Sequence, residues 1–391
     1  MSTIFSTTLV DTADHHPMLR ESVGKLAGSF GRSYFQDVYK RKAKPEELWR
    51  ALGDAGFLGV HVSEQYGGGG SGLADYNVVV EEVAAQGCPM LSLVINSICA
   101  PIIEQHGSEA LKNEWLPGLA SGKKRLSFAI TDPNAGTNTH KITTTARREG
   151  NDWVINGNKY WTSGLDEADS VMVVCRSDTP DDKGRHPLSL FIVPANHPGI
   201  CRTPIETALH VPETSFTVFF DDVRVGPEAL VGTEGQGLKQ LFAGLNPERV
   251  CAAAINNGIA RYAIERGSRQ AQERSVWGVP IGAHQGVSHP LAQSYIAVQQ
   301  ARLMTARAAQ LFDAGSGDAG EAANMAKFAA ADASLLALDQ AMQVHGGNGM
   351  AIEYGLADLW FIARLHKTAP VSREMILNFV SQHSLGLPKS Y

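Results

Sequence analysis

The sequence predicts a mainly α-helical protein that carries a separate β domain in its middle. Three changes of texture along the 391 residues support this prediction. Apolar residues recur at helical spacing over residues 1–125, Val and Thr alternate with polar residues over 126–235, and alanine and long-chain residues dominate 236–391. We therefore expect an N-terminal helical domain, a middle β domain and a C-terminal helical bundle.

The N-terminal domain is expected to contain several helices. Residues 47–57 and 75–87 carry apolar side chains at helical spacing, and each segment is followed or ended by glycine. A third helix is expected within 109–124, where Pro117 and Gly118 should stop it.

The middle region has the alternation that is typical of strands. Residues 142–161 are expected to form strands joined by tight turns at Gly150-Asn151 and Asn156-Gly157. Further strands are expected at 188–195 and 216–225. Strands and helices do not alternate here, so a doubly wound parallel sheet is not expected.

The C-terminal region contains long amphipathic segments separated by short loops. They are residues 249–274, 289–315 and 321–346. Long helices with short connections pack antiparallel, which predicts a bundle.

Composition excludes several classes of protein. The net charge is −6 and no run of Lys and Arg stands out, so a nucleic-acid partner is not expected. The five cysteines are far apart without a C-x-x-C pair, which favours reduced thiols in the cytoplasm over disulfides or zinc. The N-terminus does not read as a signal peptide, and the longest apolar stretch, 91–103, is too short to span a membrane. The histidines show no metal-binding spacing, so no metal is expected, and His15-His16 should be solvated.

Two polar segments of the middle region are candidates for a binding site. FAITDPNAGTN (128–138) offers the hydroxyls of Thr131 and Thr137, although an ordinary turn would have the same composition. NKYWTSG (158–164) places Trp161 and Ser163 on the same side of a strand, where an aromatic plate and a hydroxyl suit a flat polar ring. A core tryptophan is the plain alternative.

A glycine-rich segment near the C-terminus is not a dinucleotide-binding loop. HGGNGM (345–350) follows a helix and lacks the G-x-G-x-x-G spacing. We interpret it as a helix end where backbone approaches another group closely.

Together and in order, these segments resemble the acyl-CoA dehydrogenase family over nearly the whole chain. FAITDPNAGTN resembles T-E-P-x-A-G-S-D, and NKYWTSG resembles K-x-W-I-T-N. ERSVWGVPIGAHQ (273–285) resembles the R-x-x-F-G…Q stretch, and MQVHGGNGM (342–350) resembles Q-x-x-G-G-x-G. The resemblance implies a helical domain, a β-barrel-like middle domain and a four-helix bundle. It also implies FAD, an acyl-CoA substrate of fatty acid metabolism, a homotetramer and an electron-transfer flavoprotein as electron acceptor.

The resemblance also implies roles for individual residues. Thr131 would contact the pyrimidine edge of the flavin, Trp161 and Ser163 would line its reactive side, and Thr137 would contact the pyrophosphate. The other FAD contacts implied lie in the C-terminal region. Arg274 and Gln285, with Trp277 replacing a phenylalanine, would hold the FAD of a neighbouring subunit, and Gln343 and Gly347 would complete its pyrophosphate and adenine end.

The expected reaction removes an α-proton from a thioester, which requires a positioned carboxylate. Most members of the family carry it as the Glu of an E-G-T motif. In TAPVSREM (368–375) Pro370 takes the position of that Glu, Val371 that of Gly and Ser372 that of Thr, while Glu374 aligns with a position nearer the cofactor. The usual base is therefore missing, and proline has no N–H to donate to the thioester carbonyl.

A second arrangement in the family places the base as a Glu immediately before a conserved Arg, as in the isovaleryl-CoA and long-chain branches. NPERV (246–250) has Glu248 before Arg249 at the matching place. The resemblance implies Glu248 as the base, with Arg249 in the substrate site. Pro247-Glu248 would also suit an ordinary helix start capped by Asn246.

Other functions stay open on the sequence alone. The loss of the usual base at Pro370 would also fit a flavoenzyme of the same fold with different chemistry, such as an oxidase or an enzyme acting on another carrier. A non-catalytic FAD-binding homologue is a third possibility. WFIARL (360–365), where the family usually has R-D-A-R, is a further departure.

Overall fold

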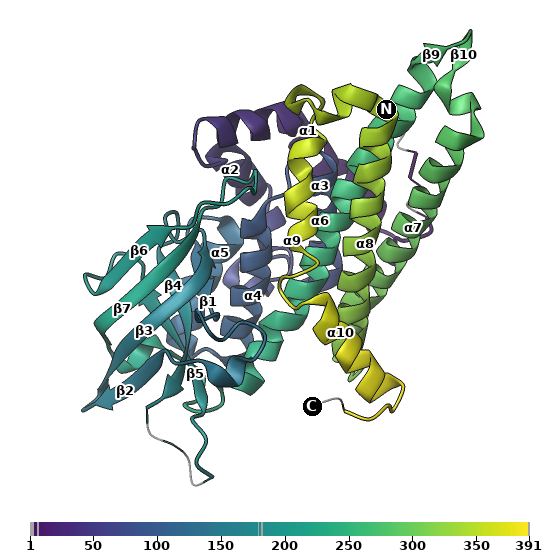
Figure 1. The fold of residues 1–391 in the computed structure, drawn as a ribbon. Coiled ribbons are helices and arrows are strands. Elements are labelled where there is room, and N and C mark those ends of the chain that lie inside the picture. Colours follow the sequence, from purple (N-terminus) through teal and green to yellow (C-terminus); the bar gives the residue numbers. More distant parts are fainter. Residues whose placement is uncertain (1–3, 6–7, 179, 181–182, 390–391) are drawn as a thin grey trace.

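The computed structural model describes residues 4–5, 8–178, 180 and 183–389. Helices of the N-terminal region, a sheet and a long helical bundle follow each other along the chain, and the sheet lies at one end of the molecule (Figure 1). This arrangement confirms the predicted fold class.

The N-terminal region is built from helices that pack on the long helices of the bundle. They are α1 (His16–Lys40), α2 (Glu46–Asp54), α3 (Leu73–Ala85), α4 (Leu91–His106) and α5 (Glu109–Ser121). The predicted stop of α5 is wrong, because the helix continues through Pro117 and Gly118 to Ser121. Burial of Trp115, Leu116 and Leu119 outweighs the backbone hydrogen bond that Pro117 cannot donate, and Gly122 ends the helix in the left-handed conformation.

The sheet is mostly antiparallel, as the absence of strand–helix alternation predicted. Its strands are β1 (Leu126–Ala129), β2 (Thr145–Glu149), β3 (Asp152–Ser163), β4 (Ser170–Ser177), β5 (Leu188–Pro194), β6 (Ile200–Pro204), β7 (Ser215–Val225) and β8 (Leu230–Val231). They run in the order β6-β7-β3-β2-β4-β5-β8, and β1 pairs with β4 in parallel.

One of the two predicted turns is confirmed and the other is wrong. Gly150 and Asn151 form the turn between β2 and β3. Asn156 and Gly157 lie inside β3, where the pairing with β7 shifts register. Gly157 has φ of 139° there, and a Cβ on it would lie 2.6 Å from the Cα of Thr144. Gly157 therefore forms part of a β-bulge inside β3, and the chain makes no hairpin turn at this point.

The C-terminal bundle contains α6 (Gly237–Glu273), α7 (Gln285–Asp313) and α8 (Ala319–His345), followed by the short α9 (Trp360–Leu365) and α10 (Arg373–Phe379). The chain between α6 and α7 forms a small hairpin of β9 (Ser275–Val276) and β10 (Val279–Pro280). The helix α6 starts well before the predicted residue 249, which matters for the position of Glu248.

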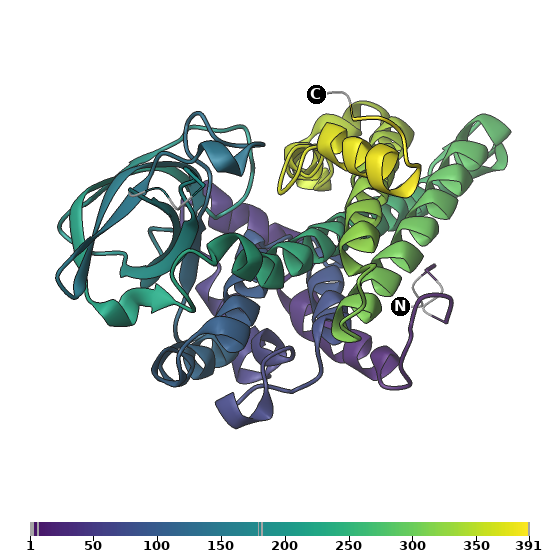
Figure 2. The same cartoon turned by 90° about the horizontal axis from the view of Figure 1, so that it is seen from below.

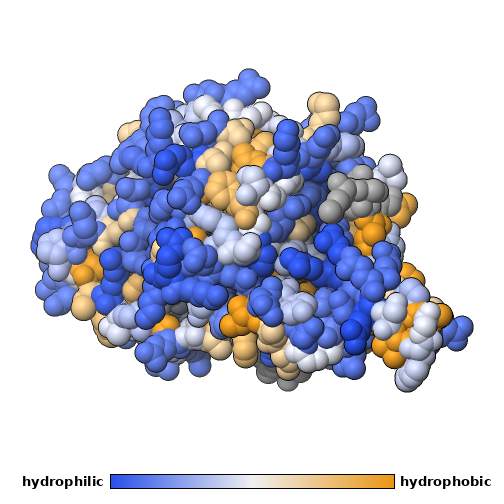
Figure 3. All heavy atoms as spheres, turned by 90° about the horizontal axis from the view of Figure 1, so that it is seen from above, coloured by the Kyte–Doolittle hydropathy of each residue, from blue (hydrophilic) through white to orange (hydrophobic). Residues whose placement is uncertain are grey.

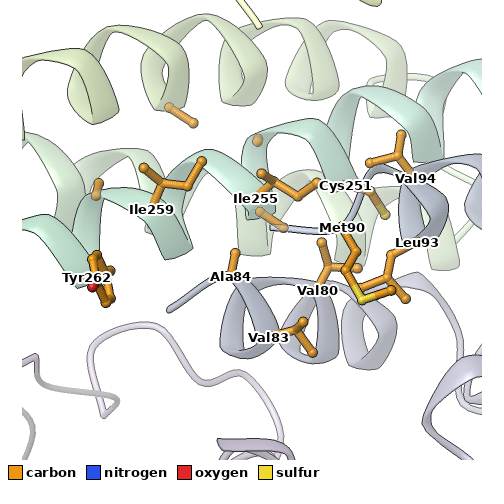
Figure 4. Packing of buried hydrophobic residues seen from close by; sticks show 14 of the residues in the cluster. Val80, Val83, Ala84, Met90, Leu93, Val94, Cys251, Ile255, Ile259 and Tyr262 are labelled. Atoms are coloured by element: carbon orange, nitrogen blue, oxygen red, sulfur yellow. The ribbon is translucent and has the colours of Figure 1, made fainter. Parts of the chain in front are cut away.

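The N-terminal helices and the bundle share one core. Val80 and Ala84 of α3 and Leu93 of α4 pack against Cys251 and Ile255 of α6, all of them buried (Figure 4). Buried alanines along α6 and α8 let these helices approach closely, since a Cβ on Gly267 would lie 3.2 Å from the Cα of Ala341. The helix α6 therefore packs against α3, α4 and α8.

Two views show how the ends of the molecule differ. The sheet lies at one end and the β9–β10 hairpin at the opposite end in both Figure 1 and Figure 2.

The face seen from above is largely hydrophilic, with apolar side chains in separate patches (Figure 3). Within the part of the chain that the structure describes, no helix has both the length and the apolar composition to cross a bilayer.

Candidate active site

A buried ion pair fixes the loop that follows β1 against β3. The ammonium of Lys159 lies 2.7 Å from Asp132 Oδ1, and both side chains are buried. Asp132 also accepts hydrogen bonds from the N–H groups of Thr143 and Thr144, at 2.6 and 2.9 Å. Burial opposes ionisation of Asp132, but Lys159 and these donors lower its pKa below the ordinary value. The loop is therefore held by a charged, hydrogen-bonded anchor that the motifs alone did not reveal.

This anchor positions the first group of predicted flavin contacts. The N–H of Tyr160 donates to the carbonyl of Thr131 at 2.8 Å, so the two segments run side by side. Trp161 has φ of 61° where β3 and β7 shift register, and its side chain is 47% exposed. Thr162 is buried while Ser163 is half-buried and pairs with the hydroxyl of Ser215 at 2.9 Å. An exposed indole thus lies in the same segment as accessible hydroxyl groups. Thr137 is exposed farther along the loop.

The second group of predicted FAD contacts lies at the other end of the bundle. Arg274 is the C-cap residue of α6, Trp277 in the hairpin is 88% exposed, and Gln285 begins α7. Gln343 in the last turn of α8 and Gly347 just after it are also exposed. Within one chain these residues are remote from the sheet (Figures 1 and 2). The fold does not bring the two groups together in a single subunit.

Glu248 lies inside α6 and not at its start. The helix begins at Gly237, with Gln236 at the N-cap position, so the helix-start interpretation of Pro247-Glu248 is wrong. The apolar residues around Leu241 pack against α4, and a Cβ on Gly244 would lie 2.5 Å from the carbonyl oxygen of Ile98. This packing keeps the chain helical through Pro247.

The surroundings of Glu248 change its acidity. Burial raises the pKa of this carboxyl to about 7, although the charges of Arg249 and Lys327 act in the opposite direction. Arg249 is held by a 2.7 Å hydrogen bond to Asn246 Oδ1 in the preceding turn. A carboxyl with this pKa can take up and release a proton at neutral pH.

Lys327 is a residue of this region that the motifs did not identify. It lies on α8, is 1% exposed and donates to the carbonyl oxygen of Val371 at 2.5 Å. Buried alanines, among them Ala323 and Ala330, lie one helical turn from it on either side. A buried lysine within an alanine-rich helix was the available signal, because lysine is almost never fully buried without a partner.

The segment TAPVSREM joins α9 to α10 along α8. Pro370 follows a cis peptide bond, and Ser372 caps α10 by accepting from the N–H of Met375 at 3.3 Å. Glu374, in the first turn of α10, is exposed. Residues 368–373 contain no carboxylate side chain, and Val371 is the first residue after Pro370 with a backbone N–H.

The prediction that His15 and His16 are solvated is wrong for His16, which is buried. Their Nε2 atoms lie 2.7 and 2.8 Å from the two carboxylate oxygens of Asp75, within a group that has the composition of a metal site. The N–H of Thr12 donates to His16 Nδ1 at 3.3 Å, so the ring proton is on Nε2 and points at Asp75. These contacts are hydrogen bonds that fix α1 against α3.

Comparison with known proteins identifies the family. Models of the acyl-CoA dehydrogenase N-terminal, middle and C-terminal domains match residues 13–123, 127–223 and 235–385. Acyl-CoA dehydrogenase FadE12 of Mycobacterium tuberculosis (strain ATCC 25618 / H37Rv) is 49% identical over 381 residues, 97% of this chain and 98% of the relative.

Solved structures agree with these matches. The structure of glutaryl-coenzyme A dehydrogenase in complex with glutaryl-CoA has a TM-score of 0.92 at 29% identity and covers 97% of both chains. A glutaryl-CoA dehydrogenase from Mycobacterium smegmatis in complex with FADH2 shares the fold, with a TM-score of 0.89 at 24% identity over 99% of this chain and 97% of that one. The three domain models together match most of the chain, and it belongs to the acyl-CoA dehydrogenase family of oxidoreductases.

Proposed function

We propose that this protein desaturates an acyl-CoA thioester between its α- and β-carbons and that Glu248 is the base. The observation that carries the proposal is the position of Glu248 on α6, where burial raises the pKa of its carboxyl to about 7. Pro370 takes the position of the usual base, and Lys327, whose charge acts on Glu248, donates a hydrogen bond to Val371 in the same segment.

FAD is the cofactor, and the residues on the sheet fit a flavin. The exposed indole of Trp161 offers a flat aromatic surface, and Thr131 and Ser163 offer hydroxyls in the adjoining segments. When bound, FAD would supply the acceptor for the hydride that leaves the β-carbon. We assign the role of electron acceptor to an electron-transfer flavoprotein.

The chain's own contribution to the reaction is proton transfer and positioning. The carboxylate of Glu248 takes the α-proton, so the electron pair of the Cα–H bond forms the new double bond as the β-hydride departs. Donors on the thioester oxygen stabilise the negative charge that develops there. Since Pro370 has no N–H, the N–H of Val371 is the donor that we assign to this segment.

The remote group of predicted FAD contacts supports an oligomer, which we take to be a homotetramer. Arg274, Trp277 and Gln285 are exposed at the end of the bundle away from the sheet of their own subunit. An exposed guanidinium suits a diphosphate. We assign these residues, with Gln343 and Gly347, to the FAD of a neighbouring subunit.

An anaerobic titration tests the reaction. Saturated acyl-CoAs of increasing length are mixed with the FAD-loaded protein, and one length class is expected to bleach the visible absorbance of the oxidised flavin. The bleaching identifies the substrate class at the same time. Retention of FAD without bleaching by any thioester in the series would contradict the proposal.

A pH dependence is expected for the same half-reaction. Because Glu248 acts as a base, it must be ionised, and its pKa is raised by burial to about 7. The value of kcat/KM for flavin reduction should therefore fall about tenfold per pH unit below pH 7 and level off above it. If kcat/KM falls only near the pKa of an ordinary exposed carboxyl, Glu248 is not the base.

The replacement at Pro370 favours a second candidate function, a flavoenzyme of the same fold with oxidase chemistry. The two candidates differ in how the reduced protein reacts with oxygen. Slow reoxidation by oxygen after reduction by acyl-CoA is expected for the dehydrogenase, and rapid reoxidation would favour the oxidase.

A further inference from the structure

The contacts of Lys327 with the segment around Pro370 suggest a role in the reaction. Lys327 is 1% exposed, and its ammonium donates to the carbonyl of Val371 at 2.5 Å. This carbonyl follows the position where the usual base is missing. The bond fixes the backbone immediately after the N–H that we assign to the thioester oxygen.

The charges of groups on several elements act on this ammonium. These groups are Glu248 and Arg249 on α6, Glu374 on α10 and Asp332 on α8 itself. Burial and the repulsion from Arg249 lower the pKa of Lys327 to about 8, although the three carboxylates act against this shift. Asp332 is already paired with Lys367 at 2.7 Å and with Arg373. Glu374 is exposed, which weakens its effect through solvent screening.

A neighbouring histidine supplies no compensating charge. His366 is buried with Nδ1 3.2 Å from Asn256 Oδ1, and burial together with Lys327 lowers its pKa to about 3. It is therefore neutral at the pH of catalysis. The cations that act on Glu248 are then Arg249 and Lys327.

We propose that Lys327 is a positioning residue that couples the ionisation of Glu248 to the backbone at Val371. Its positive charge favours the ionised form of Glu248, and its hydrogen bond holds the donor peptide beside the same substrate. The inference rests on the proposed role of Glu248 as the base. Lys327 would act on Glu248 through its charge and on Val371 through a hydrogen bond. Substitutions can separate these two effects.

Three substitutions at Lys327 test the proposal in the FAD-loaded protein. Lys327→Met removes the charge and the hydrogen bond, Lys327→Gln keeps a donor without the charge, and Lys327→Arg keeps the charge. The pH profile of flavin reduction by the best acyl-CoA is measured for each. Lys367→Met is the matched control, because it removes a lysine charge near the same segment by breaking the ion pair with Asp332 of α8.

Removing the charge in Lys327→Met and Lys327→Gln should move the acid limb of the kcat/KM profile to a pH about one unit higher. At low pH, kcat/KM for flavin reduction should therefore be about tenfold lower than in the wild type. Lys327→Arg and Lys367→Met should keep the wild-type limb. On the high-pH plateau, Lys327→Gln should exceed Lys327→Met because it can still donate to Val371. The limb distinguishes this role from a structural one, which would lower the rate equally at every pH.

Two outcomes distinguish this inference from the proposed function. A wild-type limb in both Lys327→Met and Lys327→Gln, with Glu248→Gln inactive, would overturn the role of Lys327 alone. Full activity of Glu248→Gln would overturn the base assignment and this inference with it. If Lys327→Met does not fold, Lys327→Gln decides the charge effect by itself.

Discussion

Glu248→Gln is expected to slow flavin reduction by acyl-CoA about 10²–10⁴-fold, because the amide cannot accept the α-proton. The substitution keeps the shape of the side chain and removes a half-buried carboxyl, so the fold and the bound FAD should be retained. Stopped-flow mixing under anaerobic conditions measures the rate, and the ratio of flavin to protein absorbance measures FAD content.

Two further readouts make the Glu248→Gln result specific. The exposed Glu21 of α1 is a matched control, and Glu21→Gln should reduce the flavin at the wild-type rate. Binding of an acyl-CoA should still perturb the flavin spectrum of Glu248→Gln, because the site is intact. Turnover of Glu248→Gln at the wild-type rate would show that another group is the base.

Lys159→Met is expected to be the most destabilising of the substitutions considered. It leaves Asp132 buried without its cation, and breaking a buried ion pair in this way costs about 3–5 kcal/mol. The loop that carries Thr131 loses its anchor to β3, so FAD content should fall as well. Denaturant unfolding followed by tryptophan fluorescence measures the loss of stability.

An exposed ion pair provides the control for Lys159→Met. Arg41 and Asp37 are paired at 2.9 Å at the C-terminal end of α1, with both side chains more than half exposed. Arg41→Met should cost at most about 1 kcal/mol. Asp132→Leu combined with Lys159→Met should lose less than the sum of the two single substitutions, because it leaves no charge unpaired. Equal stability of Lys159→Met and wild type would show that the ion pair of Lys159 and Asp132 does not stabilise the fold.

Local patterns were sufficient for the fold class but not for every boundary. The periodicity of apolar residues predicted the order of helices, sheet and bundle, because side-chain burial repeats with the geometry of each element. It failed at Pro117, at Asn156-Gly157 and at the start of α6. At each of these places tertiary packing overrode the local preference of proline or glycine.

The candidate site divides in the same way. The motifs led to Trp161 and Glu248, because each of these residues lies in a short segment whose residue types and spacing resemble those of the family. The motifs did not lead to the anchor of Asp132 and Lys159, or to Lys327 beside Val371. These pairs are distant in sequence, and only the folded chain brings them within hydrogen-bonding distance.

The sequence by itself thus determined the order of the three regions, and its resemblance to the family led to Pro370 and to Glu248 as the proposed base. Only the tertiary structure decided that Glu248 lies inside a helix, that burial raises the pKa of its carboxyl to about 7 and that the charge of Lys327 on α8 acts against this shift. The physical reason is that secondary structure follows from short-range periodicity. The acidity of a carboxyl depends on burial and on charges that distant segments bring to it.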